Sequence, residues 1–455
     1  MLGKKAGRAL AFFTVAALIG DGFLNTPKAL AQGKNPYKAV SNKDADGDGK
    51  VSLEEWPKSK AIFRKIDKDK DGFLSPEDFA KHWGIPLPQR RAAASAGGKK
   101  KAKPGAGPGC PEQSVERADT PYVIEKNRPT CAFTGTTLFV DSAATPVIVE
   151  MDMSGNVVWR HDPGSGDTTR CNRVGNCETV NGPLVPMDVT RLANGNTLYG
   201  AKRNGLYEVN AAGKVVWKHM DGQASHDVDR LPNGNTLYAR GWVGKGEDHL
   251  REVTPDGTIV WSWNGLKQYD RDPYGGVEDQ GWIHVNAATR MPNGNTWISL
   301  RNFDIFVEVD RAGNVVREVK LPLPGTKISK KDRERTSSTF KLVAPHDPEV
   351  AANGNLLIPH AGVGGLLVET DPSGTKIIFQ KRFRRGKQRI YHIRDANRLP
   401  NGNILITSAS RLVEINARGR VVWQMKHSEL AEKVKNDNQF FKAIRIAPDG
   451  TAYGG

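Results

Sequence analysis

One repeat occupies most of this 455-residue chain and restricts the folds that the chain can adopt. A short apolar strand returns at intervals of roughly 40 to 60 residues, a period typical of β-propellers. In that fold each repeat forms a four-stranded antiparallel sheet, or blade, which buries its faces against its neighbours. The recurring strand reads NVVWRH, KVVWKH, TIVWSW, NVVREV, KIIFQK and RVVWQM.

The repeat predicts an all-β domain over residues 119–455, and counting its units favours a six-bladed β-propeller. The segment that begins with TTLFVDS lacks an innermost strand, whereas the C-terminal segment FKAIRIAPDGTAYGG has one to offer. We therefore expect one blade to combine both ends of the repeat region. Seven blades are the alternative if residues 122–125 contribute strands. Four tryptophans are expected to fill space between blades: Trp159, Trp217, Trp261 and Trp423.

Residues 1–31 have the features of a secretory signal peptide. Basic Lys4 and Arg8 precede the apolar run ALAFFTVAALIG, and the small residues at 29–31 (ALA) suit a signal peptidase. The run is too short to span a membrane comfortably, and no other stretch is long and apolar enough. We expect an exported, periplasmic or extracellular protein without a membrane span.

Two acidic loops in residues 32–84 match the ligand pattern of a calcium-binding EF-hand pair, a small α-helical module. Gly49 and Gly72 occupy the position that permits the sharp bend, and Val51 and Leu74 lie where paired loops join through a short β-bridge. The second loop ends in Asp78, which is shorter than the usual glutamate, so we expect weaker binding there. We expect calcium to serve as a structural cofactor. The predicted ligands are Asp44, Asp46, Asp48, Lys50, Glu55, Asp67, Asp69, Asp71, Phe73 and Asp78.

Basic charge is concentrated in a few segments. The net charge is +16, much of it in residues 99–105, 327–335 and 381–389. The first of these belongs to a linker, residues 85–118, which is rich in Ala, Gly, Pro and Lys and has no apolar period. No recognisable nucleic-acid module accompanies the charge, so no nucleic-acid partner is expected. The segments are either solvated loops or a positive rim that attracts anionic substrates or polymers.

Four cysteines in an exported chain predict two disulfides. Cys171 and Cys177 lie six residues apart in one loop and are expected to pair. Cys110 and Cys131 would then form the second bridge.

Four histidines occur at matching places in successive repeats, just before a turn that ends in Asn-Gly. They should begin the innermost strand of their blades and therefore lie at one mouth of the central channel. His226 and His346 precede the turn by the same interval, whereas His284 and His392 lie two residues earlier. That offset preserves strand parity, so all four could point into the channel. His360 follows another strand and could also reach the mouth.

Imidazoles gathered in this way suit two kinds of chemistry. Three or four of them can bind zinc or iron. Alternatively, a neutral imidazole can attack sulfur or phosphorus while an arginine and the other imidazoles neutralise the oxygens. Asp347 and Asn286 could orient imidazole rings, although neighbours in a strand point to opposite faces. No glycine-rich phosphate loop is present, so no nucleotide cofactor is expected.

The stretch WIHVNAATRMPNGNTWISLRNFDIFVEVDRAGNVV (282–316) resembles the core motif of bacterial arylsulfate sulfotransferases, and PHDPEVAANGNLLI from Pro345 resembles a second motif of that family. The resemblance implies a six-bladed propeller and a transient sulfohistidine. It implies that His346 is the nucleophile and that His284 and Arg301 bind the sulfuryl oxygens. It further implies that His226 completes the pocket and protonates the leaving phenolate.

This interpretation predicts a PAPS-independent enzyme that moves a sulfuryl group from an aryl sulfate donor to a phenolic acceptor. The EF-hand pair departs from the family, whose familiar periplasmic members carry a β-rich N-terminal domain. Two alternatives stay open. One is a non-catalytic, calcium-binding propeller scaffold that binds anionic polymers or proteins, and the other is a propeller enzyme with a histidine-bound metal.

Overall fold

A computed structural model of the chain divides it into two compact units, Met1–Gly109 and Cys110–Gly455. The predicted signal peptide, most of the predicted linker and every predicted calcium ligand from Asp44 to Glu55 lie outside the described residues. No helix in the described part of the chain is both long and apolar enough to cross a membrane. The structure describes residues 51–83 and 110–454, apart from 54–55, 57–58, 68, 116–118, 143–144, 172–176, 329, 331–332, 334–341, 363–364, 384–389, 391 and 429–439.

The N-terminal unit has the elements of an EF-hand around its second acidic loop. The predicted bridge between the two loops is confirmed, because the backbone of Val51 lies opposite that of Leu74. Both side chains are fully buried in a small apolar core that also holds Trp56, Phe63 and Phe79. The elements are β1 (Val51–Ser52), α2 (Lys60–Ile66), β2 (Phe73–Leu74) and α3 (Pro76–Trp83).

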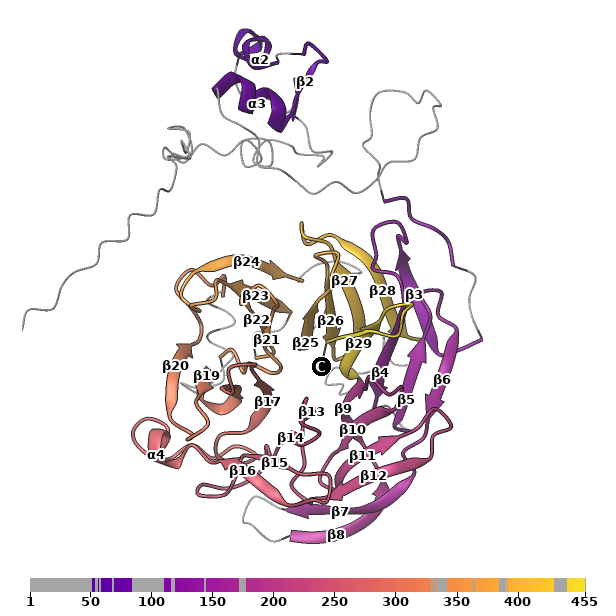
Figure 1. The fold of residues 1–455 in the computed structure, drawn as a ribbon, viewed down its shortest axis with the longest axis vertical. Coiled ribbons are helices and arrows are strands. Elements are labelled where there is room, and N and C mark those ends of the chain that lie inside the picture. Colours follow the sequence, from indigo (N-terminus) through magenta and orange to yellow (C-terminus); the bar gives the residue numbers. More distant parts are fainter. Residues whose placement is uncertain are drawn as a thin grey trace, which may run out of the picture. The chain divides into compact units, whose positions relative to one another are not determined.

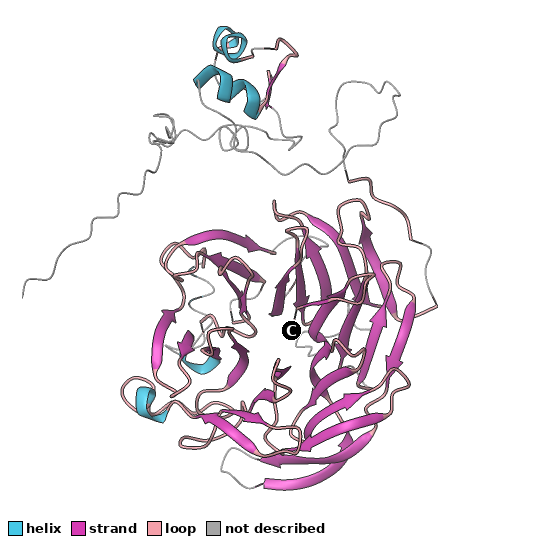
Figure 2. Cartoon of the chain, viewed as in Figure 1, coloured by secondary structure: helices cyan, strands magenta, loops and turns pink. Residues whose placement is uncertain are grey.

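The second unit is a ring of six sheets whose inner strands face a common centre (Figure 1). Its described residues are almost entirely strand and loop (Figure 2), with one short helix, α4 (Leu266–Tyr269), and one 3-10 turn, η1 (Arg301–Phe303). From the innermost strand outward, blade 2 is β9 (Pro186–Arg191), β10 (Thr197–Ala201), β11 (Gly205–Val209) and β12 (Val215–Met220). Blade 3 is β13 (Val228–Arg230), β14 (Thr236–Ala239), β15 (Leu250–Val253) and β16 (Ile259–Trp263).

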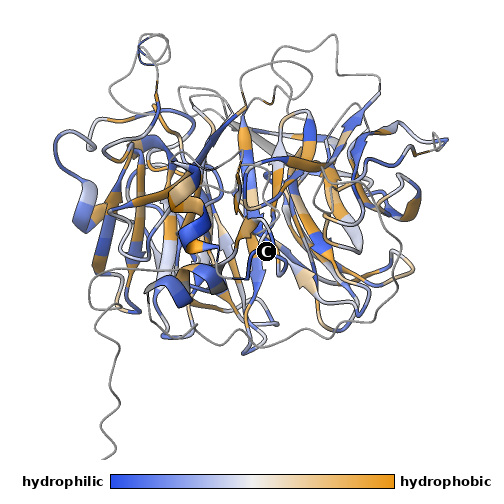
Figure 3. Ribbon diagram, turned by 90° about the horizontal axis from the view of Figure 1, so that it is seen from above, coloured by the Kyte–Doolittle hydropathy of each residue, from blue (hydrophilic) through white to orange (hydrophobic). Residues whose placement is uncertain are grey.

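Blades 4 and 5 follow the same plan. Blade 4 is β17 (Val285–Arg290), β18 (Thr296–Leu300), β19 (Ile305–Val309) and β20 (Val315–Lys320). Blade 5 is β21 (Glu349–Val350), β22 (Leu356–His360), β23 (Leu366–Thr370) and β24 (Ile377–Arg382). Apolar and polar residues are interleaved along the strands (Figure 3), and the apolar ones meet between neighbouring blades.

The remaining blades combine segments from both ends of the repeat region. Blade 1 joins β29 (Phe440–Ile446) to β4 (Thr136–Asp141), β5 (Val147–Met151) and β6 (Val157–His161), with β30 (Ala452–Tyr453) paired to β29. Blade 6 is β25 (Ile393–Arg398), β26 (Ile404–Ser408), β27 (Arg411–Ile415), β28 (Val421–His427) and an added outer strand, β3 (Tyr122–Asn127). The predicted six blades are confirmed, and residues 122–125 extend blade 6 instead of starting a seventh.

One of the two predicted disulfides is present in the described residues. Cys110 and Cys131 are bonded, which confirms that pair. The backbones of Cys171 and Cys177 lie opposite each other in a separate hairpin of β7 (Ser165–Cys171) and β8 (Cys177–Pro183). Their side chains lie outside the described part, so the second disulfide stays a prediction.

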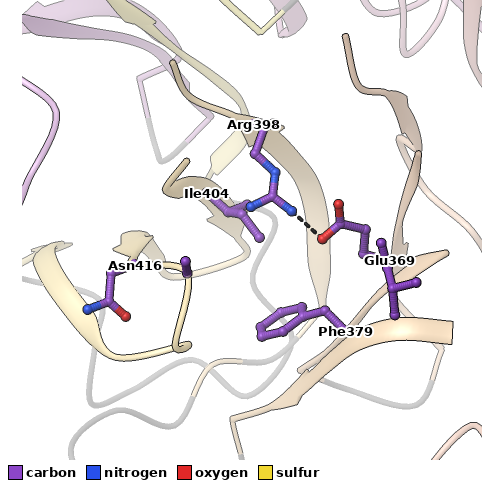
Figure 4. A pocket seen from close by; sticks show the side chains of 7 residues that line it. Glu369, Phe379, Arg398, Ile404 and Asn416 are labelled. Carbon is purple, nitrogen blue, oxygen red and sulfur yellow. Dashed lines mark hydrogen bonds and ion pairs between the residues drawn. The ribbon is translucent and has the colours of Figure 1, made fainter. Parts of the chain in front are cut away.

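An arginine and a glutamate of the repeat link neighbouring blades. Arg230, at the end of β13, lies 2.9 Å from Glu208 of blade 2 and donates to the carbonyl of Gly234 in its own turn. Glu208 also accepts a hydrogen bond from Asn196 at 2.7 Å. Figure 4 shows the equivalent pair between blades 5 and 6, beside a pocket of about 270 Å³. The pairs at four of the other five interfaces are Arg191–Glu150, Arg290–Glu252, Arg398–Glu369 and Arg445–Glu414.

The interface between blades 4 and 5 departs from this pattern because Val350 stands in the arginine's place. Glu308 pairs instead with Arg317 of its own blade at 3.4 Å, and Arg317 donates to the carbonyl of Pro372 in blade 5. In four other blades the equivalent outer-strand residue is a tryptophan whose indole N–H reaches a carbonyl of the next blade. The predicted placement of tryptophans between blades is confirmed for Trp159, Trp217, Trp261 and Trp423.

Candidate active site

Three of the four predicted histidines lie together at one end of the inner strands. His226 precedes β13, His284 precedes β17 and His346 precedes β21, so the cluster draws on three successive blades. The ring centroids of His226 and His284 are 5.1 Å apart, and those of His226 and His346 are 5.4 Å apart. Residues distant in sequence thus form one group of imidazoles, to which we refer as the histidine cluster.

The fourth histidine has a different environment. His392 is exposed, and its Nδ1 lies 3.1 Å from the carbonyl oxygen of Ala361. The expectation that all four histidines share one place fails for His392, whereas His284 joins the cluster despite its two-residue offset. Strand alternation alone does not account for the offset. His284 and His392 have positive φ angles of 55° and 46°, and a β-bulge follows each of them. The backbone of His360 lies opposite that of Pro345, and its side chain is fully buried with Nδ1 3.0 Å from the carbonyl oxygen of Ile358.

The loop before His284 is held by Asn302, whose role the sequence pattern did not predict. Asn302 is fully buried, and its side-chain amide donates to the carbonyls of Asp279, Gly281 and Trp282 at 3.0 to 3.1 Å. The last turn of this loop brings the carbonyl oxygen of Gln280 to 2.8 Å from Nδ1 of His284. A carbonyl accepts only, so Nδ1 carries the proton and Nε2 is left for the site.

His346 is held by blade 4 as well as by its own blade. The side chain of Asp304 accepts hydrogen bonds from the backbone N–H groups of Val343 and Ala344, at 3.2 and 2.7 Å. Ser299 donates to the carbonyl of Pro345 at 2.7 Å. The imidazole itself is hydrogen-bonded to the backbone of Arg394 in blade 6. These bonds fix the segment that delivers His346 to the cluster.

Cationic side chains surround the three imidazoles and favour their neutral form. Burial, Arg301 and Lys202 are among the causes that hold the pKa of His226 well below its ordinary value. Burial and then Arg301 lower the pKa of His284 to about 3. Burial, Arg394 and Arg301 hold the pKa of His346 well below 6.5. Neutral imidazoles beside fixed positive charge make a site for an anion that a nitrogen lone pair can attack.

Three further residues border the histidine cluster and were not anticipated. The ring of Trp242 lies 4.9 Å from that of His226 and 6.0 Å from that of His284. Lys202 Nζ and Arg203 Cζ lie over the Trp242 ring, 5.4 and 5.0 Å from its centroid. A signal existed in the repeat, because Arg203 and Arg301 both follow the second strand of a blade and precede an asparagine.

Next to the histidines the inner strands carry buried carboxylates. Asp347 lies 2.6 Å from Lys442 Nζ, so it pairs with that ammonium and does not orient the His346 ring. Asp395 also lies near Lys442, at 3.8 Å. Asn286 is buried with neither amide atom hydrogen-bonded, so it does not orient an imidazole either. The two suggested ring-orienting residues are therefore replaced by Asn302 and the Arg394 backbone.

The second acidic loop of the N-terminal unit fits a calcium ion. Asp67, Asp69 and Asp71 are the one group of potential metal ligands among the described residues whose ligand atoms lie within 4.8 Å of one another. Gly72 has a φ of 87°, which lets the loop turn sharply, and the oxygen donors suit calcium. Asp78 accepts hydrogen bonds from the N–H and hydroxyl of Ser75. The histidine cluster is not such a group, so its geometry gives no support to a histidine-bound metal.

Comparisons with known proteins agree with both parts of this description. Residues 117–317 match the sequence model of the arylsulfotransferase (ASST) family, and residues 44–57 and 60–81 match that of the EF hand. The first match includes His226, His284 and Arg301 and ends before His346.

Solved structures with a similar fold include two bacterial proteins. A protein of unknown function from Bacteroides caccae is 16% identical, with a TM-score of 0.45, over 64% of this chain and 93% of that chain. Virginiamycin B lyase from Staphylococcus aureus is 12% identical, with a TM-score of 0.39, over 66% of this chain and 88% of that chain. These two likenesses carry no information about activity. The family match, the six blades and the acidic loops identify the chain as an arylsulfotransferase-like β-propeller protein with an N-terminal EF-hand pair.

Proposed function

We propose that this chain transfers a sulfuryl group from an aryl sulfate ester to a phenol through a sulfated His346. The observation that carries the proposal is the contact between the His226 ring and those of His284 and His346, beside Arg301. The match to the arylsulfotransferase family supports the reaction class. No nucleotide donor is required, since the aryl sulfate itself supplies the sulfuryl group.

The first half of the reaction begins at His346. Its ring nitrogen that is not hydrogen-bonded to the Arg394 backbone attacks sulfur and forms an N–S bond. The S–O bond to the aryl group breaks, and its electron pair leaves with the phenolic oxygen. Charge spreads over the sulfuryl oxygens in such a loose transition state, and Arg301 offers a fixed fork of donors to them.

His284 and His226 gain protons only when an anion is bound. Both are neutral in the free protein, because burial and nearby cations lower the pKa values of their imidazoles. A bound sulfate ester brings opposite charge and favours the protonated forms. Nε2 of His284 then donates to a sulfuryl oxygen, and His226 supplies a proton toward the leaving phenolate. In the second half an acceptor phenol gives its proton to His226, which is neutral again, and its oxygen attacks sulfur. The N–S bond breaks, and its electron pair returns to His346.

In this proposal residues 1–31 direct the protein out of the cytoplasm, and the EF-hand pair has a structural role. We place the mature protein in an exported, periplasmic or extracellular compartment, an assignment supported by the Cys110–Cys131 disulfide and the features of residues 1–31. Calcium is abundant outside the cytoplasm, so the EF-hand pair would bind it as a structural ion. The basic segments would form a rim that attracts anionic esters.

The test uses purified mature protein with 4-nitrophenyl sulfate as donor and phenol as acceptor. We expect nitrophenolate release that depends on phenol, and donor-treated protein that gains the mass of one sulfuryl group on His346. His346→Asn should abolish both, and Arg301→Ala should slow release by a factor on the order of 100. His219→Asn, a matched change in the outer strand of blade 2, should leave the rate unchanged.

Two results would contradict the proposal. Folded, calcium-loaded protein that releases no nitrophenolate would favour the non-catalytic scaffold. Nitrophenolate release from a protein that carries the added mass on His284 would support a sulfotransferase activity but exclude His346 as the nucleophile.

A further inference from the structure

The residues around Trp242 form a second part of the site, which we call the tryptophan platform. It consists of Trp242, from the β14–β15 connection of blade 3, with Lys202 and Arg203 from the β10–β11 connection of blade 2. Both cations lie within 5.4 Å of the Trp242 ring centroid. Because that ring also contacts His226 and His284, the platform borders the histidine cluster on the side of blade 2.

The chain holds the platform in place through close backbone packing. A Cβ at Gly241 would lie 2.8 Å from the carbonyl oxygen of Val285, and the Gly241 N–H donates to Ser225 at 2.8 Å. A Cβ at Gly281 would lie 2.8 to 2.9 Å from backbone atoms of Gly241, Trp242 and Val243. Glycine at both positions therefore lets the Trp242 segment lie directly against the loop that carries His284.

Transfer from an aryl sulfate needs positive charge at two places. Arg301, beside His284 and His346, meets the sulfuryl oxygens. A second cation beside the aryl oxygen stabilises the negative charge that develops there before the proton from His226 arrives. We infer that the tryptophan platform is the leaving-group and acceptor subsite, in which Lys202 stabilises an aromatic oxyanion and the exposed part of Trp242 contacts its ring. This inference rests on the proposed function and names the substrate part that the platform binds.

The roles follow from the balance of the two half-reactions. When the S–O bond breaks, its electron pair goes to the aryl oxygen. The Lys202 ammonium offsets the charge that develops there without giving up a proton, and the proton itself comes from His226. By microscopic reversibility the acceptor occupies the same place, gives its hydroxyl proton to His226 and develops negative charge on its oxygen as it attacks sulfur. Arg203, over the Trp242 ring, adds positive charge and fixes the indole. Aromatic esters are thereby favoured over alkyl esters.

The test varies the leaving group in the donor half-reaction, with a series of phenyl sulfates whose phenols differ in acidity. We expect Lys202→Met to slow the poorest leaving groups by roughly 10- to 100-fold and 4-nitrophenyl sulfate only a few-fold, because a weakly basic phenolate needs less stabilisation. The slope of log kcat/KM against leaving-group pKa should therefore steepen. Lys202→Arg should restore much of the wild-type slope. Lys214→Met, an exposed lysine in the β11–β12 turn of the same blade, should leave the slope unchanged.

A binding measurement separates this inference from the proposed function. Calorimetric titration with 4-nitrophenolate at pH 8 needs no turnover, and we expect Lys202→Met to weaken binding roughly 10-fold while Lys214→Met does not. Equal slowing of every ester, or unchanged phenolate binding, would overturn the role of Lys202 while leaving the sulfohistidine route intact. A third outcome is that the wild-type protein transfers no sulfuryl group, while Lys202→Met still weakens phenolate binding. That outcome would overturn the proposed reaction and keep the subsite.

Discussion

The orientation of His284 depends on Asn302, which touches neither substrate nor sulfur in the proposed mechanism. Its amide holds three carbonyls of the loop that precedes the histidine. Asn302→Ala should lower kcat by a factor on the order of 10 to 100, because small displacements of a reacting group are costly. The KM for the donor should change little. Steady-state kinetics with 4-nitrophenyl sulfate measures both.

Asn295 in the same blade provides the matched control. It is hydrogen-bonded to Glu308 at the other end of β18, away from the histidines. Asn295→Ala should reduce the free energy of unfolding by about 1 kcal/mol and leave kcat unchanged. Equal losses of kcat in the two variants would show that Asn302 acts only through general stability.

The low pKa values of the cluster give a second residue-scale prediction. An ordinary imidazole would be protonated, and lost as a nucleophile, below a pH of about 6.5. Burial and the nearby arginines keep the pKa of His346 well below that value. The kcat/KM of the donor half-reaction should therefore not fall between pH 8 and pH 5, provided that circular dichroism shows folded protein throughout. A decline with an apparent pKa near 6.5 would contradict a nucleophile shielded in this way.

The candidate site was only partly predictable from the sequence. The repeat predicted that histidines of successive blades would meet, since equivalent positions in a propeller lie at the same depth. It did not predict Asn302, Asp304 or Trp242, because their partners belong to other loops or blades. Nor did it predict the exposure of His392, which depends on a left-handed residue and a bulge.

At the scale of elements, the Arg–Glu pairs explain why separate sheets behave as one ring. Arg230 links its own turn to Glu208 of the preceding blade, and its guanidinium lies over Trp217 at 4.5 Å. Arg230→Met should lower the free energy of unfolding by about 1 to 3 kcal/mol, because it leaves a largely buried carboxylate without its cationic partner. Denaturant titration measures this loss. In the double variant with Glu208→Gln, the second change should cost less than it does alone.

The blade 4–5 interface shows the limit of element-scale prediction. The repeat correctly predicted strands and turns there, since alternation and Asn-Gly turns are local signals. Val350 replaces the inter-blade arginine there, and Arg317 of another strand compensates for it. Arg317 pairs with Glu308 and donates a hydrogen bond to the carbonyl of Pro372. No local pattern signals it, because both residues suit their own strands.

The second EF-hand loop gives an element-scale prediction about calcium. Asp67, Asp69 and Asp71 are grouped for binding, whereas Asp78 is turned toward Ser75 and carries a short side chain. Asp78→Glu should tighten calcium binding by roughly 10-fold, since the longer carboxylate reaches the ion with both oxygens. Asp69→Asn should weaken it. Calorimetric titration of calcium into the chelator-treated protein measures both, and equal affinity in the three proteins would show that the loop does not bind the ion.

At the scale of the whole molecule, Lys442 ties the last inner strand to the other blades. Burial alone would lower the pKa of its ammonium, but carboxylates of four blades raise it well above the ordinary value. Those carboxylates belong to Asp347, Asp395, Asp188 and Asp227. The ring is thus closed by pairing between β29 and β4 and also by charge at its centre. The carboxylates outnumber this one ammonium, which makes the centre of the ring sensitive to pH.

The excess of carboxylates over the Lys442 ammonium at the centre of the ring predicts how the free energy of unfolding depends on pH. Burial and the charge of Asp188 raise the pKa of Asp229 from 3.8 to about 7. A raised folded-state pKa contributes stability that is fully present below pH 3.8 and is lost as the pH rises through 7. Asp229→Asn removes this loss, so at pH 9 the variant should exceed the wild type by about 2 to 4 kcal/mol in the free energy of unfolding. Near pH 4 the two should agree. Asp162→Asn, a change at an exposed residue, is the control, and its free energy of unfolding should follow that of the wild type at every pH. If the difference in this free energy between Asp229→Asn and the wild type did not change with pH, the Asp229 carboxyl would have to stay charged inside the ring.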